Sequence, residues 1–186
     1  MRSLRLTFVL MLTAASGWAS AGEERPALKA LPARAQQLVT TWLALDCGAP
    51  NPLTEEMARG RGALEGSLWE AYELGPGASE RAALQASLVQ AWAARRAWIQ
   101  RDGPRSLGVE AAGQLAAVTE EDYRSSQVRR LETRYRDAAL AGLGLACTER
   151  SRPRLESIAS DDTNPSQQAA REALRRSGGC STRPPR

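Results

Sequence analysis

The chain has 186 residues, a formal net charge of +4 and no histidine. The absence of histidine excludes Ser-His and Cys-His nucleophilic catalysis, His-ligated zinc and histidine proton shuttles. The length suits one domain of ordinary size, and because alanine is abundant while large apolar residues are scarce, we expect a thinly packed helical fold.

Residues 1–21 have the pattern of a secretory signal peptide. Two arginines precede an apolar run over residues 6–12, and the small residues Ala19, Ser20 and Ala21 follow it. Removal of this segment lowers the formal net charge from +4 to +2, which disfavours nucleic acid as a partner. No second apolar run reaches the length of a membrane span. We therefore expect an exported, soluble protein that is periplasmic or extracellular.

The remaining chain predicts helices separated by Gly and Pro turns, with no segment that alternates as a strand does. Residues 22–30 are expected to form a polar lead-in, residues 31–178 a single all-helical domain, and residues 179–186 a flexible basic tail. In chain order, helices are predicted over about residues 32–45, 52–74, 79–101, 106–118, 120–146 and 153–159, with a last helix that ends near residue 178.

Two of these helices carry specific signals. Thr119, followed by acidic residues at 120–122, is typical of a helix N-terminus, because a hydroxyl caps the first turn and carboxylates complement the helix dipole. Arg95 falls inside the apolar stripe of the helix over 79–101. Its stem either lies along the core with the guanidinium in water, or it is the buried partner of a carboxylate. That stripe spans about 120° of the helix and consists of Leu84, Leu88, Ala91, Trp92, Trp98 and Ile99.

Three cysteines allow one intramolecular disulfide, which export would preserve. Cys47 and Cys147 each follow a predicted helix, whereas Cys180 lies in the tail, so we expect a bond between Cys47 and Cys147. No Cys-x-x-Cys pair is present, which disfavours redox catalysis.

The C-terminal part contains an internal similarity at an offset of 31 residues, because Ala138-Ala139 aligns with Ala169-Ala170 and Leu143 with Leu174. Residues 136–178 resemble HEAT-like helical repeats of the short bacterial type. The resemblance implies that the alanine pairs let paired helices approach closely, and that Asp161 and Asp162 turn the chain between units.

Only one and a half repeat units are present, and stacked repeats generally need three or more. The preceding helices are therefore expected to cover the open face of the repeat. The expected fold class is all-α: an irregular antiparallel bundle over 31–118 that merges, through the long helix, into a HEAT-like end over 119–178.

Motifs for phosphate binding are absent, so no nucleotide, cofactor or metal is expected. Two-carboxylate chemistry on a glycan is the enzymatic possibility that survives. Its candidates are Glu65, Glu70 and Glu73, beside Trp69 and Tyr72, whose rings could stack on sugars. The alternative interpretation is a solvated acidic face with Trp69 at the margin of the core.

The resemblance implies a function in protein binding. We expect an exported, non-catalytic helical protein that acts as a protein–protein interaction or scaffold module in the cell envelope, with an unidentified protein or peptide partner. The candidate interaction surface comprises Trp69, Tyr72, Arg95 and Trp98. Two alternatives stay open: a carboxylate-dependent protein that binds or hydrolyses cell-wall glycan, and a purely structural domain.

Overall fold

The computed structural model describes residues 25–44 and 53–178. Over these residues the fold is all-α and contains no strand, which confirms the predicted class. The helices are α1 (Pro26–Lys29), α2 (Ala33–Ala44), α3 (Thr54–Gly60), α4 (Glu65–Leu74), α5 (Ala78–Arg101), α6 (Gly103–Leu107), α7 (Val109–Ala117), α8 (Glu120–Ala146), α9 (Arg152–Ser160) and α10 (Gln167–Gly178), with short 3-10 turns at Arg61–Leu64 and Glu149–Ser151.

The predicted helices over 79–101 and 120–146 are confirmed as α5 and α8. At the start of α8, the Thr119 hydroxyl accepts a hydrogen bond from the Asp122 backbone N–H at 3.1 Å, as its cap role requires. The predicted signal peptide and basic tail lie outside the described residues.

Three segments differ from prediction. The lead-in contains the short helix α1, whose Ala27 N–H donates to the Glu70 carboxylate at 2.9 Å. The helix predicted over 52–74 is divided into α3 and α4 because Arg61 adopts a φ of 40°, which a continuous helix does not allow. The helix predicted over 106–118 is likewise divided, since Gly108 has a φ of 83°.

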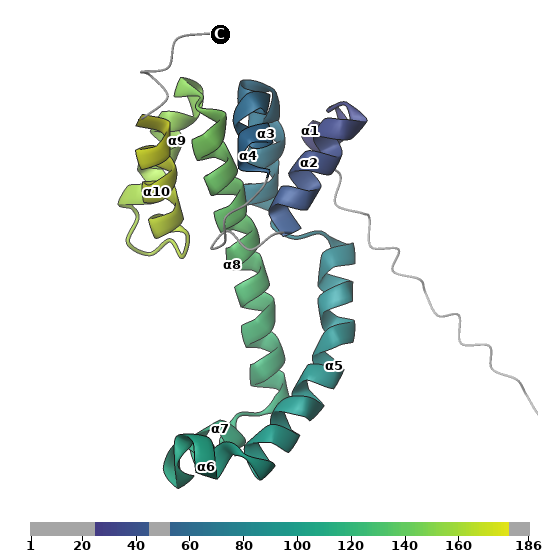
Figure 1. The fold of residues 1–186 in the computed structure, drawn as a ribbon. Coiled ribbons are helices and arrows are strands. Elements are labelled where there is room, and N and C mark those ends of the chain that lie inside the picture. Colours follow the sequence, from purple (N-terminus) through teal and green to yellow (C-terminus); the bar gives the residue numbers. More distant parts are fainter. Residues whose placement is uncertain (1–24, 45–52, 179–186) are drawn as a thin grey trace, which may run out of the picture.

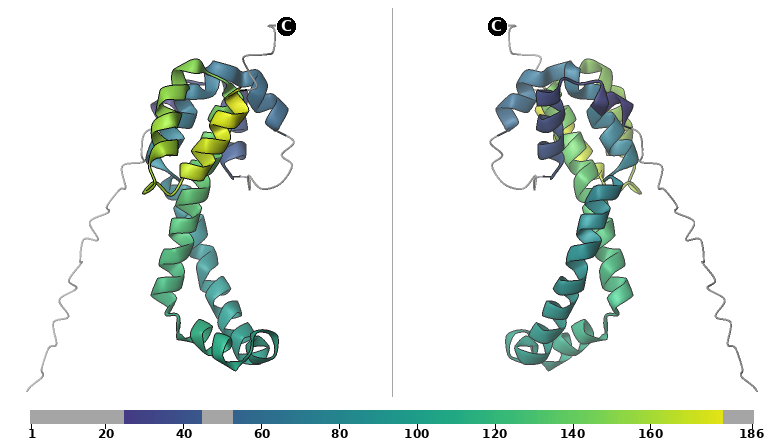
Figure 2. Two further views of the ribbon diagram at one scale, coloured as in Figure 1. Left: turned by 90° about the vertical axis from the view of Figure 1, so that its left-hand side faces the viewer. Right: turned by 90° about the vertical axis from the view of Figure 1, so that its right-hand side faces the viewer.

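The helices form a compact head and a projecting arm (Figure 1). The head consists of α1 to α4, the part of α8 from Tyr135 onward, α9 and α10. The arm consists of residues 78–134: α5 and the N-terminal part of α8 leave the head side by side, and α6 and α7 close the far end, which we call the tip. The two side views show the same division (Figure 2).

The hydrophobic core lies entirely in the head. Its residues fall between 39 and 71 or between 135 and 173, so none comes from α5, α6 or α7. Trp42 links α2 to α8. Its ring is buried, and its Nε1–H donates a hydrogen bond to the Ala138 carbonyl at 2.7 Å. The largest fully buried apolar side chains are Val39, Leu43, Met57, Leu64, Leu68, Leu140, Leu143 and Leu155.

Small residues let α8 and α10 pack closely. Ala138, Ala139, Ala170 and Ala173 are fully buried. A Cβ on Gly144 would lie 2.7 Å from the Cα of Ala173, so the two backbones touch at this point. The small size of these residues therefore allows α8 and α10 to approach each other closely.

The connection from α9 to α10 is a turn held by carboxylates. Asp161 Oδ1 accepts hydrogen bonds from the backbone N–H and the hydroxyl of Thr163, at 2.9 and 2.7 Å. Asp162 Oδ1 accepts from Gln167 Nε2 at 2.6 Å. Both residues thus have the turn role that the repeat resemblance implies. Within the described residues, no helix is both long and apolar enough to cross a membrane.

Candidate functional site

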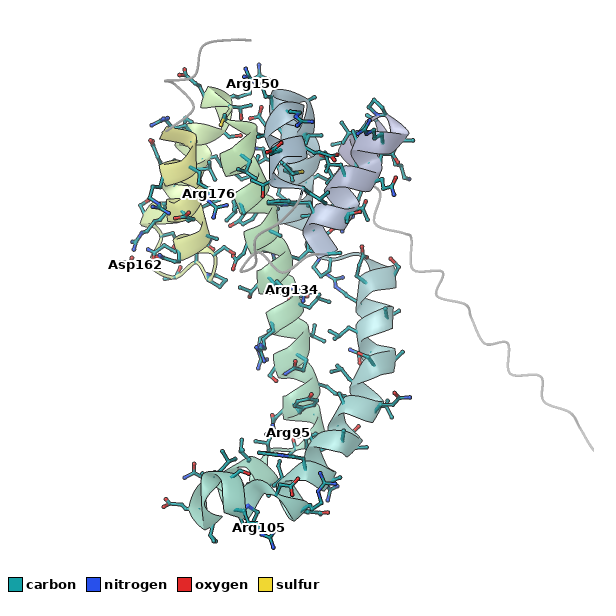
Figure 3. All side chains as sticks on the ribbon, viewed as in Figure 1. Arg95, Arg105, Arg134, Arg150, Asp162 and Arg176 are labelled. Atoms are coloured by element: carbon teal, nitrogen blue, oxygen red, sulfur yellow. The ribbon has the colours of Figure 1, made fainter. Side chains whose placement is uncertain are left out.

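The four residues of the predicted interaction surface do not lie together. Trp69 and Tyr72 belong to α4 in the head, whereas Arg95 and Trp98 belong to α5 near the tip. Figure 3 shows Arg95 at the end of the arm far from the head. The predicted interaction surface therefore combined residues from two separate parts of the molecule.

In the head, Trp69 is engaged by other parts of the chain. Its Nε1–H donates to the Ser151 hydroxyl at 2.9 Å, and the Arg154 guanidinium lies 4.1 Å from its ring centroid. The Tyr72 ring meets it edge-on, with centroids 5.9 Å apart. These contacts attach α4 to the segment that leads into α9, so the Trp69 ring has a structural role.

The three candidate carboxylates are also engaged in internal contacts. Glu70 accepts hydrogen bonds from the backbone N–H groups of Ala27 and Leu28, at 2.9 and 3.0 Å. Glu65 accepts from the Ser151 hydroxyl, and Glu73 pairs with Arg154, each at 2.5 Å. Carboxylates held in this way serve the packing of α1 and α9 against α4. Their arrangement does not favour a glycan-cleaving pair.

The arm presents the apolar surface of the molecule. Among the described residues, every large apolar side chain that is strongly exposed lies there: Val89 is 56 % exposed, Trp98 39 %, Leu107 44 % and Val109 80 %. The buried apolar residues of the arm are only Leu88, Ile99 and Ala112. Two of the four exposed residues, Leu107 and Val109, flank Gly108 at the tip, where Figure 3 also places Arg105.

An aromatic contact joins the two helices of the arm. Trp92 of α5 and Tyr123 of α8 lie with ring centroids 5.3 Å apart, and the Arg95 guanidinium is 5.5 Å from the Tyr123 ring. Arg95 Nε is buried without a hydrogen bond, and no ion pair to Arg95 occurs within the described residues. Arg95 is therefore neither a simple surface arginine nor the partner of a buried acid. It contributes a cation–π contact to the arm.

Where the arm joins the head, a hollow lies along α8. The hollow has a volume of about 840 Å³, and its charged lining comprises Arg129, Arg130, Arg134 and Asp137. Partial burial raises the pKa of the Asp137 carboxyl, and the nearby Ser166 hydroxyl lowers it only in part. Neither Asp137 Oδ1 nor Ser166 Oγ has a hydrogen-bond partner of good geometry, so burial is the main cause of the raised pKa.

The raised pKa of Asp137 predicts a pH-dependent effect of Asp137→Asn. The folded state binds the proton more tightly than the unfolded chain, so the free energy of unfolding falls as pH rises through the window between the ordinary value, about 4, and the raised value. We expect Asp137→Asn to raise the melting temperature at about pH 7, with a gain that disappears below about pH 4. Thermal unfolding of both proteins across this range measures it.

Glu172 supplies the control of opposite sign. Hydrogen bonds from Arg175 and Arg176 lower the pKa of the Glu172 carboxyl to about 2. Its contribution to stability is present above the ordinary value and is lost as pH falls toward the lowered one. Glu172→Gln should therefore lower the melting temperature at neutral pH. A gain for Asp137→Asn that is the same at every pH would contradict the assignment.

The predicted disulfide falls only partly within the described residues. Cys147 ends α8 in a left-handed conformation with a φ of 56°. It is the one cysteine of the described part of the chain, and its sulfur is disulfide-bonded. Cys47 and Cys180 both lie outside the described part, so the pairing with Cys47 stays a prediction. Among the described residues, no cluster of acidic, cysteine or histidine side chains could hold a metal ion.

The fold and its exposed surface define an all-α protein with a helical arm that projects from a packed head. No protein-family model, curated protein or solved structure matches this chain. One feature of the sequence could have indicated that the arm exposes apolar residues. Residues 82–94 carry no charge, although charged residues make up 25 % of the chain.

Proposed function

We propose that the protein is a non-catalytic interaction module of the cell envelope, which binds a protein or peptide partner through the tip of its arm. The observation that carries the proposal is the location of the exposed apolar residues: Trp98, Leu107 and Val109 all lie at or beside the tip. Exposed apolar surface of this kind is typical of protein-binding sites.

The shape of the molecule supports this function. The core lies in the head, and the arm holds the tip away from it, so a partner can contact the tip without meeting the head. The arm buries little apolar surface of its own, and burial of Leu107 and Val109 by a partner would remove further apolar surface from water. In this proposal the head is the support and the tip is the binding surface.

The resemblance of residues 136–178 to HEAT-like repeats belongs to the same proposal. The end of α8, the short α9 and α10 follow the order of helix, turn, short helix, acidic loop and helix that the resemblance implies. Helical repeats of this type supply rigid surfaces rather than catalytic groups. The internal engagement of Glu65, Glu70 and Glu73 also supports a non-catalytic protein.

The test is a crosslinking pulldown with an envelope fraction, quantified by mass spectrometry. The variant Leu107→Ser/Val109→Ser removes the exposed apolar side chains of the tip. Arg150→Ser, at an exposed position of the head, is the matched control (Figure 3). We expect the tip variant to capture about tenfold less of the partner, which corresponds to about 1.4 kcal/mol, while the control captures as much as the wild type. Equal capture by both variants would refute a binding role for the tip.

A further inference from the structure

Three arginines line the hollow along α8 without an ion pair. Arg129, Arg130 and Arg134 are exposed, and none of them makes a salt bridge or a hydrogen bond to another described residue. Arg130 and Arg134 are one helical turn apart, so their Cβ atoms lie about 5–6 Å from each other on one side of α8. Like charges at this spacing repel each other and destabilise a helix slightly. The chain therefore carries an electrostatic cost here that a bound anion would remove.

The carboxylates that are close in sequence do not neutralise these arginines. Glu132 lies two residues from both Arg130 and Arg134, and it pairs instead with Arg81 of α5, at 3.6 Å. Asp137 follows Arg134 by three residues, yet the two side chains form no ion pair. Asp137 Oδ1 is buried without a hydrogen-bond partner of good geometry. The hollow therefore has positive charge on its arm side and an unused hydrogen-bond acceptor on its head side.

The hollow has the size of a small-molecule site. Its volume of about 840 Å³ lies within the usual range of about 300–1,000 Å³. The helix rises only about 7.5 Å from Arg129 to Arg134, and Figure 3 shows Arg134 where α8 enters the arm. Leu84 of α5 and Leu131 of α8 add apolar wall. Several cations over so short a distance suit a compact ligand with more than one negative charge.

We propose that the hollow binds a small anion that carries two or more phosphate or carboxylate groups. The guanidinium group of arginine is a planar fork of donors that matches either kind of anionic group with two hydrogen bonds. In this proposal Arg130 and Arg134 share one anionic group and Arg129 holds a second one. A hydroxyl of the ligand can donate to Asp137 Oδ1. The hollow is separate from the tip, so the proposal does not depend on the proposed function of the tip.

Isothermal titration calorimetry of the purified chain with pyrophosphate and with citrate tests the proposal. The titrations are made near neutral pH and at an ionic strength of about 0.05 M, because salt screens the attraction between exposed charges. We expect saturable binding of one anion per chain. Acetate, which has a single carboxylate, should bind at least about tenfold more weakly than citrate, because it engages only part of the arginine cluster.

Arg130→Gln/Arg134→Gln removes two cations from the hollow and should weaken pyrophosphate binding by about tenfold or more, since charge-assisted hydrogen bonds are the strong ones. Arg150→Gln/Arg152→Gln is the matched control. It removes the same charge from two exposed positions of the head that do not line the hollow and make no ion pair within the described residues. This control should bind pyrophosphate like the wild type.

Thr133→Glu tests the site without removal of an arginine. Thr133 lines the hollow and lies one helical turn from both Arg129 and Arg130. A carboxylate at this position should pair with these arginines and compete with the ligand. We therefore expect weaker pyrophosphate binding in this variant as well. Circular dichroism verifies that all variants are folded.

Three results would overturn the proposal. The first is no binding of pyrophosphate or citrate at concentrations up to about 5 mM. The second is equal weakening in the hollow variant Arg130→Gln/Arg134→Gln and in the head control, which would mean that only net charge matters. The third is binding to phosphatidylglycerol vesicles without binding of either free anion, which would assign the arginines to a lipid surface. None of these results affects partner capture by the tip, so the two proposals fail separately.

Discussion

Gly144→Ala is expected to lower the free energy of unfolding by about 1–3 kcal/mol, because it forces a methyl group between two backbones. A Cβ at this position would lie 2.7 Å from the Cα and 2.8 Å from the carbonyl oxygen of Ala173. A flexible side chain could turn away, but the backbone of α10 cannot yield without moving the whole helix. Urea denaturation followed by circular dichroism measures the loss.

Gly113→Ala is the matched control for this substitution. Gly113 also lies inside a helix, α7, but no atom would come within 4 Å of a Cβ built there. Alanine has the higher helix propensity, so the control should gain about 0.5–1 kcal/mol. A loss in both variants would show that the contact with Ala173 is not the cause.

Trp42→Ala should destabilise the protein by about 3–5 kcal/mol, the usual cost of removing a buried aromatic side chain. Trp42 is 3 % exposed and its Nε1–H donates to the Ala138 carbonyl at 2.7 Å. Its loss leaves a cavity between α2 and α8 and removes the hydrogen bond that joins them. Chemical denaturation monitored by circular dichroism gives the free energy.

Two further variants separate the contributions at Trp42. Trp42→Phe keeps most of the ring but removes the hydrogen bond. Of the free energy of unfolding that this variant loses, about 1 kcal/mol should come from the missing bond. Trp98→Ala removes the same side chain from the arm, where it is 39 % exposed, and should cost less than half as much as Trp42→Ala. A larger loss at Trp98 would mean that the arm contributes more to stability than the head core.

Local sequence signals predicted the secondary structure correctly where helix boundaries are set by neighbouring residues of the chain. Thr119 and the acidic residues after it marked the start of α8, and the Gly-Pro turns bounded α5. The break after Gly60 was not predicted, because it depends on the φ of 40° at Arg61 and on the contact of α4 with the rest of the head. A Cβ at Gly60 would lie within 2.4 Å of Leu64, which is a local contact that helical periodicity does not reveal.

The prediction of the candidate site had the same limit, because local patterns do not reveal tertiary contacts. Helical periodicity placed Trp98 on one stripe with Leu88 and Ile99, yet Leu88 and Ile99 are buried while Trp98 is 39 % exposed. The reason is that α5 leaves the head and is covered only by α8 and, near the tip, by the short helices α6 and α7, so only a narrow strip of its apolar surface can be buried. Helical periodicity predicts which residues lie on the same side of a helix, but it does not predict how much of that side other helices cover.

The sequence by itself therefore determined the helical class, the two long helices and the absence of histidine chemistry. Only the tertiary structure decided which apolar residues are covered and which carboxylates are free. Glu70, for example, is bound to the backbone of α1, 42 and 43 residues earlier in the chain. Such contacts arise between segments distant in sequence, and helix propensity, capping and periodicity act only over a few turns.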